Sequence, residues 1–167
     1  MKIAQKHINS WLFTISNEKF IILSLFVSIC SRFLFNNIII FLFNQENGLE
    51  NPIVNRYSNI YIKLILSLIL APVIETFLFF FLPYRFVKFL NVKFDNLSIY
   101  GHFVPISAFL FALNHSFNIT YFLSSLFGGI IMAIFYIISE NRSNNPFTNT
   151  IIFHSLYNTF VFFVKYL

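Results

Sequence analysis

Four polar side chains that could carry out acid–base chemistry lie within apolar stretches of the sequence: Glu75, His115, His154 and Asn158. A carboxylate at the centre of a membrane helix costs ~2.5–3.5 kcal/mol, so an intramembrane Glu indicates a function. His154 and Asn158 are four residues apart and share one helix face, and Phe111 precedes His115 by the same interval. A carboxylate, two imidazoles and an amide can together activate a water molecule and stabilise an oxyanion, as peptide hydrolysis requires. Interhelical hydrogen bonding is the simpler interpretation of each His and of the Asn.

The composition indicates that these residues sit in a membrane protein. Of 167 residues, 57% are hydrophobic, 10% are charged and 26 are Phe, which is outside the range of soluble domains. At ~20 apolar residues for each crossing, the length allows about five spans and no separate soluble domain. Cys30 is the only cysteine, so no intrachain disulfide can form.

We therefore predict an all-α fold, a polytopic transmembrane helix bundle of about five spans. Residues 1–18 carry apolar positions at helical spacing opposite polar ones and predict an interfacial amphipathic helix, which leaves 19–167 for the bundle. The predicted spans are 20–43, 60–82, 99–117, 119–139 and 147–166.

Local signals refine these helices. Pro72 predicts a kink or a break just before Glu75. Gly129 and Ala133 form a small-xxx-small pair that favours close helix packing. Asn118 is a predicted N-cap, and Pro146 is a predicted first helical residue.

The net charge of +5 does not point to nucleic acid, because the basic residues are scattered between the apolar spans. The expected partners are membrane lipids and a peptide or membrane-protein substrate. The positive-inside rule places the N-terminus in the cytoplasm. One side carries Lys2, Lys6, Lys19, Arg85, Lys88, Lys93 and Arg142, against Arg56, Lys63 and Lys165 on the other.

Three motifs resemble the CAAX protease and bacteriocin-processing (CPBP, or Abi) family of intramembrane glutamic endopeptidases. That family's pattern is Glu-Glu-xxx-Arg, Phe-xxx-His and His-xxx-Asn/Asp on successive helices. The matching stretches here are 71–76, 111–115 and 154–158, within a core at about 68–163. The resemblance implies a membrane-embedded peptidase, in the bacterial inner membrane, in which Glu75 is the general base and His115 orients the water. It implies that His154 and Asn158 donate to the oxyanion.

Two positions depart from the family's pattern. Thr76 stands where the second Glu is usual, and Phe80 stands where Arg is usual. Arg32, from the first span, could supply the missing positive charge.

Three other interpretations remain open. We expect no cofactor, but Glu75, His115 and His154 could instead be zinc ligands, since three N/O ligands and a water make a catalytic zinc site. A non-catalytic membrane immunity or scaffolding protein of the same fold would explain the two departures. A proton or ion pathway would need a polar file across the whole bilayer, and too few polar residues are present for one.

Overall fold

The structure is a computed structural model. It describes residues 14–43, 59–93, 99–142 and 145–166. These residues form helices and no strands, so the predicted all-α fold is confirmed. Of the predicted interfacial helix at 1–18, residues 1–13 lie outside the described residues. The elements are α2 (Asn17–Phe43), α4 (Ile60–Ile65), η2 (Leu66–Leu70), α5 (Ala71–Thr76), η3 (Phe77–Phe81), α6 (Leu82–Lys93), α7 (Ile99–Asn114), α8 (Ile119–Arg142) and α9 (Pro146–Tyr166).

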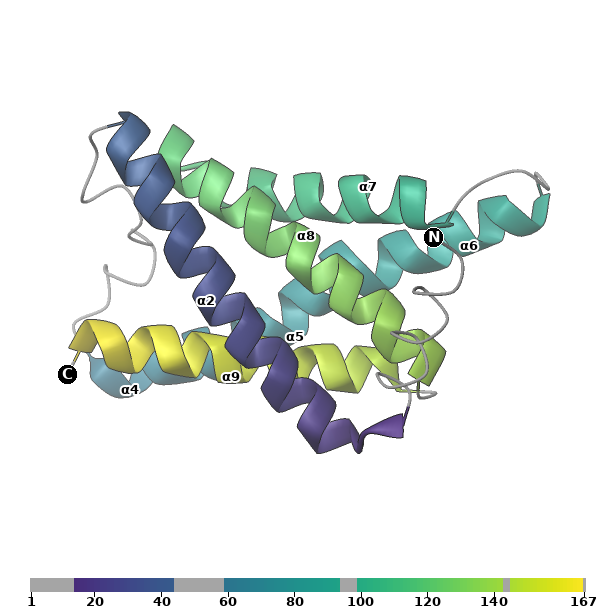
Figure 1. Ribbon diagram of the computed structural model, residues 1–167, viewed down its shortest axis with the longest axis horizontal. Coiled ribbons are helices and arrows are strands. Elements are labelled where there is room, and N and C mark those ends of the chain that lie inside the picture. The colour runs from purple at the N-terminus through teal and green to yellow at the C-terminus, as the bar shows by residue number, and fades with distance from the viewer. Residues whose placement is uncertain (1–13, 44–58, 94–98, 143–144, 167) are drawn as a thin grey trace.

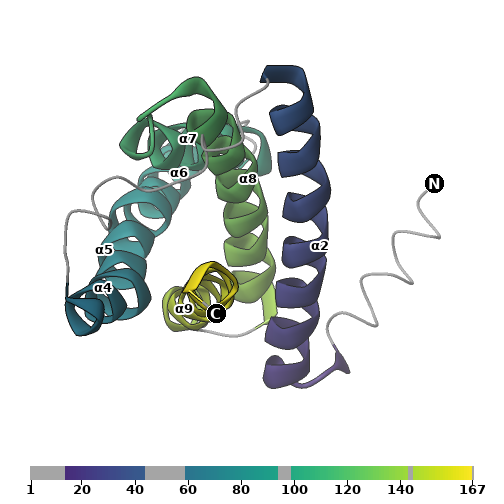
Figure 2. The same cartoon turned by 90° about the vertical axis from the view of Figure 1, so that its left-hand side faces the viewer.

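The elements from α4 to α6 form one continuous helical rod, and α8 and α9 lie between this rod and α2. Figure 2 shows α8 and α9 in the middle, with α4 and α5 on one side and α2 on the other. In Figure 1, α2 crosses α9 obliquely and its C-terminal end lies beside the start of α8, and it packs against both. Helix α9 therefore contacts the rod on one side and α2 on the other.

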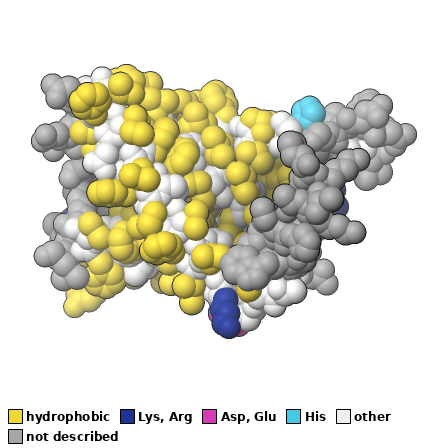
Figure 3. All heavy atoms as spheres, in the orientation of Figure 1, with side chains coloured by type: hydrophobic (Ala, Val, Ile, Leu, Met, Phe, Trp, Pro, Cys, Tyr) yellow, Lys and Arg dark blue, Asp and Glu magenta, His cyan; other side chains and the backbone are white. Residues whose placement is uncertain are grey.

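The surface is that of a membrane protein. The face in Figure 3 is covered mostly by hydrophobic side chains, and its few charged side chains lie at the edge. Among the described helices, α2, the rod from Ile60 to Asn91, and α8 are long and apolar enough to cross a membrane. Helix α7 has 16 residues, or about 24 Å at 1.5 Å per residue, which is shorter than a full crossing. The polytopic bundle is thus confirmed, while the count of five spans stays a prediction.

Aromatic rings join the central helices. Phe135 of α8 stacks on Phe20 of α2 and on Phe153 of α9, with ring centroids 4.9 and 4.3 Å apart. Near the other face of α8, Tyr136 contacts Tyr84 of α6 and Phe103 of α7. Offset or tilted ring pairs of this kind add to the stability that burial alone supplies.

The predicted caps are present. Asn118 Oδ1 accepts a hydrogen bond of 2.7 Å from the Tyr121 N–H, and α9 begins at Pro146 as expected.

Of the kink or break predicted at Pro72, the break is absent, and a wide turn of helix is found instead. The backbone keeps helical angles at Leu70 and Ala71, but the Ala71 N–H donates to Leu66 O, five residues back. In an ordinary helix the proline ring would collide with the carbonyl four residues earlier, and a π turn relieves this without ending the helix. The same arrangement recurs at Pro83, where the Leu82 N–H donates to Phe77 O. The segment that carries Glu75 therefore lies between two π turns.

Gly129 is required where α7 packs on α8. A Cβ at Gly129 would lie 2.8 Å from Ala108 Cα and 3.1 Å from its carbonyl oxygen. These are backbone atoms, so the two helices would have to separate. We expect Gly129→Ala to lower the free energy of unfolding by about 1–3 kcal/mol, measured by thermal or denaturant unfolding in detergent.

Gly128→Ala is the matched control for this prediction. The three atoms nearest to a Cβ there belong to the end of the Arg32 side chain, with Nη1 at 2.9 Å, and that side chain can shift. Equal stability of the Gly129 variant and wild type would contradict the close α7–α8 contact.

Candidate active site

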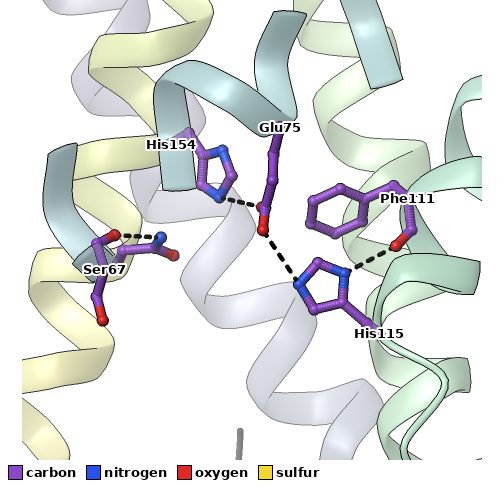
Figure 4. Close-up of polar contacts among 6 residues, drawn as sticks. Ser67, Glu75, Phe111, His115 and His154 are labelled. Carbon is purple, nitrogen blue, oxygen red and sulfur yellow. Dashed lines mark hydrogen bonds and ion pairs between the residues drawn. The ribbon is translucent and has the colours of Figure 1, made fainter. Parts of the chain in front are cut away.

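Glu75 projects from α5 into the bundle between two imidazoles. Its Oε1 lies 3.7 Å from His115 Nε2, and its Oε2 lies 3.6 Å from His154 Nε2. The side chain of Glu75 is 14% exposed. Figure 4 shows the carboxylate with His154 on one side and His115 on the other. The structure thus brings together three residues from three separate stretches of the chain.

His115 is held by the end of α7. It follows Asn114, the last residue of that helix, and its backbone N–H donates to Ala112 O at 2.9 Å. Its Nδ1 lies 2.8 Å from Phe111 O, and since a carbonyl only accepts, Nδ1 is the donor. In the neutral ring the remaining nitrogen, Nε2, is then an acceptor directed at Glu75. The Phe111 ring packs 4.4 Å from the imidazole, as its position four residues earlier suggested.

His154 presents the opposite tautomer to the same carboxylate. Its side chain is buried in α9, and its Nδ1 is a buried atom that has no hydrogen-bond partner among the described residues. Its Nε2 faces a carboxylate oxygen, which accepts only, so the proton belongs on Nε2. One imidazole is therefore an acceptor and the other a donor toward Glu75.

Both separations from Glu75 are longer than a direct hydrogen bond, which has a donor–acceptor distance of about 2.7–3.2 Å. The carboxylate is therefore close to both rings without being locked to either. A polar contact of this length leaves the geometry open to a bridging water.

Asn158 occupies a different position from the one we expected. It lies one helical turn after His154, but its Nδ2 donates to the backbone oxygen of Ser67 at 2.9 Å. The partner, Ser67, appears at a separate place from the Glu75 carboxylate in Figure 4. Our sequence reasoning missed Ser67. Pro72 signalled a missing donor for the carbonyl of Leu68, four residues earlier, whereas Ser67 O lacks a backbone donor because the helix widens before Pro72.

The two positions that depart from the family's pattern are both fully buried. The Thr76 hydroxyl has no hydrogen-bond partner among the described residues, and Phe80 packs on Phe111 with ring centroids 5.7 Å apart. Where the family's pattern has Arg, this chain therefore has an aromatic ring that packs on α7, the helix that ends directly before His115.

Arg32 belongs to a polar cluster between α2, α8 and α9. Its Nη2 donates to Ser124 Oγ at 3.0 Å, the Ser124 hydroxyl donates to Asn36 Oδ1 at 2.8 Å, and its guanidinium lies over the Tyr157 ring at 4.9 Å. Its hydrogen bond is therefore to Ser124 and not to Glu75. The proposed electrostatic help from Arg32 would have to act across α9.

A metal site is the other chemistry that this donor set could support. The described residues contain no group of three His, Cys, Asp or Glu side chains arranged to hold a metal ion. If zinc does bind, Glu75, His115 and His154 are the residues that would hold it, and chelation is the test.

The fold and the site define a polytopic helical membrane protein with a buried carboxylate between two imidazoles. The family model of the type II CAAX prenyl endopeptidase Rce1-like proteins matches residues 57–160. Because this is more than half of the chain, the protein belongs to that family, which is related to the one that the three motifs resemble. No curated protein and no solved structure matches the chain significantly. The chain is therefore an integral membrane protein of a protease family, and α2 lies outside the matched residues.

Proposed function

We propose that the protein is an intramembrane endopeptidase in which Glu75 activates a water molecule for attack on a peptide bond. The observation that supports this proposal is the position of the Glu75 carboxylate between an acceptor, His115 Nε2, and a donor, His154 Nε2. Membership of a protease family makes hydrolysis the reaction class to test first.

The two imidazoles take different parts in this mechanism. A water between Glu75 and His115 donates one hydrogen bond to Glu75 Oε1 and one to His115 Nε2. These two bonds direct an oxygen lone pair at the substrate carbonyl carbon. As the O–C bond forms, the water proton passes to Glu75 and negative charge develops on the carbonyl oxygen. The N–H of His154 Nε2 stabilises that oxyanion. When the C–N bond breaks, Glu75 returns the proton to the leaving amine.

The substrate is a peptide or a membrane protein whose scissile bond reaches the bundle interior. The surrounding partners are membrane lipids, and we place the protein in a bacterial inner membrane with its N-terminus in the cytoplasm. Labelling of single cysteines at either end of the chain, from one side of the membrane, tests this orientation.

The second candidate is a non-catalytic immunity or scaffolding protein of the same fold. Thr76 and Phe80 favour it, because both are fully buried and neither can supply the charge that the family's pattern has there. Glu75 would then be retained only as an interhelical contact.

A proteolysis assay separates these possibilities. Purified protein in liposomes is mixed with a library of membrane peptides, with and without 1,10-phenanthroline, and Glu75→Gln serves as the blank. We expect cleavage by wild type that resists the chelator. Cleavage that the chelator abolishes and zinc restores would support the metal-dependent form, and no cleavage beyond the blank would support the scaffolding protein.

A further inference from the structure

The first π turn leaves one backbone carbonyl without its usual donors. In a helix, Ser67 O would accept a hydrogen bond from residue 71 in an α turn or from residue 72 in a π turn. The Ala71 N–H donates instead to Leu66 O, and Pro72 has no N–H. Within a membrane, no bulk water is available to satisfy such a group.

Asn158 supplies the missing donor from the neighbouring helix. Its Nδ2 lies 2.9 Å from Ser67 O, and the π turn and α5 both pack against α9. Ser67 precedes Glu75 by eight residues, about two turns, and Asn158 follows His154 by one turn. The Ser67–Asn158 bond and the Glu75–His154 contact therefore join the same two helices at neighbouring levels.

This bond ties the axial position of the rod to that of α9. Apolar packing alone permits two helices to slide or rotate slightly, but a directional hydrogen bond to one carbonyl does not. The distance from Glu75 Oε2 to His154 Nε2 depends on that relative position. The Asn158 N–H that donates to Ser67 O is also not available to a substrate carbonyl.

We propose that Asn158 is a positioning residue: it replaces the backbone donor that Pro72 removes, and so holds the helix that carries Glu75 in place against His154. The consequence for catalysis rests on the function proposed above, whereas the structural part does not.

Removal of Pro72 provides the decisive test. With Ala at position 72 the chain regains an N–H, so Ser67 O finds a backbone donor whether the turn stays wide or closes to an α turn. Asn158→Ala alone is expected to lower kcat/KM by about tenfold or more, mainly through kcat, the equivalent of about one lost hydrogen bond. The double variant Pro72→Ala/Asn158→Ala is expected to recover most of that loss relative to Pro72→Ala.

Pro83→Ala is the matched control. It restores an N–H after the second π turn, which has the same hydrogen-bond pattern but does not involve Ser67. Pro83→Ala/Asn158→Ala should therefore show the full loss caused by Asn158→Ala. If Pro72→Ala gives no more rescue than Pro83→Ala, the proposal is wrong and Asn158 acts on the substrate directly.

Thermal unfolding of the same variants in detergent tests the structural part without activity. Asn158→Ala should lower the melting temperature in the wild-type and Pro83→Ala backgrounds and leave it nearly unchanged in the Pro72→Ala background. An equal decrease in all three backgrounds would overturn the proposal. This measurement remains decisive if Pro72→Ala is itself inactive, and also if wild type cleaves nothing and the proposed function fails.

Discussion

Replacement of Glu75 by Gln is expected to lower kcat by about 100- to 10,000-fold, which is the usual contribution of a general base. Gln has nearly the same shape, so it fills the same space between His115 and His154. It cannot accept a proton from water, so the attacking oxygen is no longer activated. The measurement is steady-state cleavage of a membrane peptide by protein reconstituted in liposomes.

Two controls separate lost chemistry from lost structure. The Glu75→Gln protein should unfold at the same temperature as wild type or higher, because a buried carboxylate is removed. Glu75→Asp keeps a proton acceptor but withdraws it by one methylene, so we expect activity between those of Gln and wild type. An unchanged kcat in a stable Glu75→Gln protein would contradict the proposed mechanism.

His154→Ala is expected to lower kcat by about 100- to 1,000-fold with little change in KM, as the loss of one oxyanion donor does in other hydrolases. The reason is that the N–H of His154 Nε2 meets negative charge only in the transition state. His154→Gln can place an amide N–H near the position of Nε2, so it should retain more activity than His154→Ala. Separate measurements of kcat and KM on one peptide distinguish the two variants.

Ile152→Ala is the matched control for His154. Ile152 is on the same helix but is 42% exposed, whereas His154 is buried, and so truncation of Ile152 should change neither constant appreciably. If the His154 variants raise KM and leave kcat unchanged, His154 binds substrate and does not stabilise the oxyanion.

Much of the helical layout could be predicted from apolar runs alone. The stretches around Glu75 and His154 fall in helices where expected, and Asn118 and Pro146 begin theirs. The second span was predicted to end near Leu82, and the basic residues Arg85 and Lys88 favoured a connection after it that could also continue the helix; the helix does continue, as α6, to Lys93. Lys88 Nζ lies 3.0 Å from Glu140 Oε1 of α8, so this basic side chain has an acidic partner that is far away in the sequence.

The site was predictable to the extent that side-chain spacing determines it. Glu75 and His154 lie on helix faces turned to the bundle, and His115 directly follows the last residue of α7, one residue past the end of that helix, so the three side chains meet. The partner of Asn158 was not predictable from spacing, because it is a backbone oxygen that became available only when the helix widened before Pro72. Hydropathy and motif patterns describe side chains. They do not predict a change in the pattern of backbone hydrogen bonds within a helix.

The two π turns also bear on which changes in chain length the protein can absorb. A π turn contains about one residue more than an α turn, so a single deletion within Leu66–Leu70 or Phe77–Phe81 can be taken up by closing that turn, provided that the proline that follows it is replaced by Ala to avoid the ring clash. The same deletion within Ala71–Thr76 would rotate Glu75 by about 100° relative to the part of the rod on the other side of the deletion. With that replacement, the rod has two places where its length can vary by one residue. The Glu75 carboxylate lies in the stretch between them, where the length cannot vary.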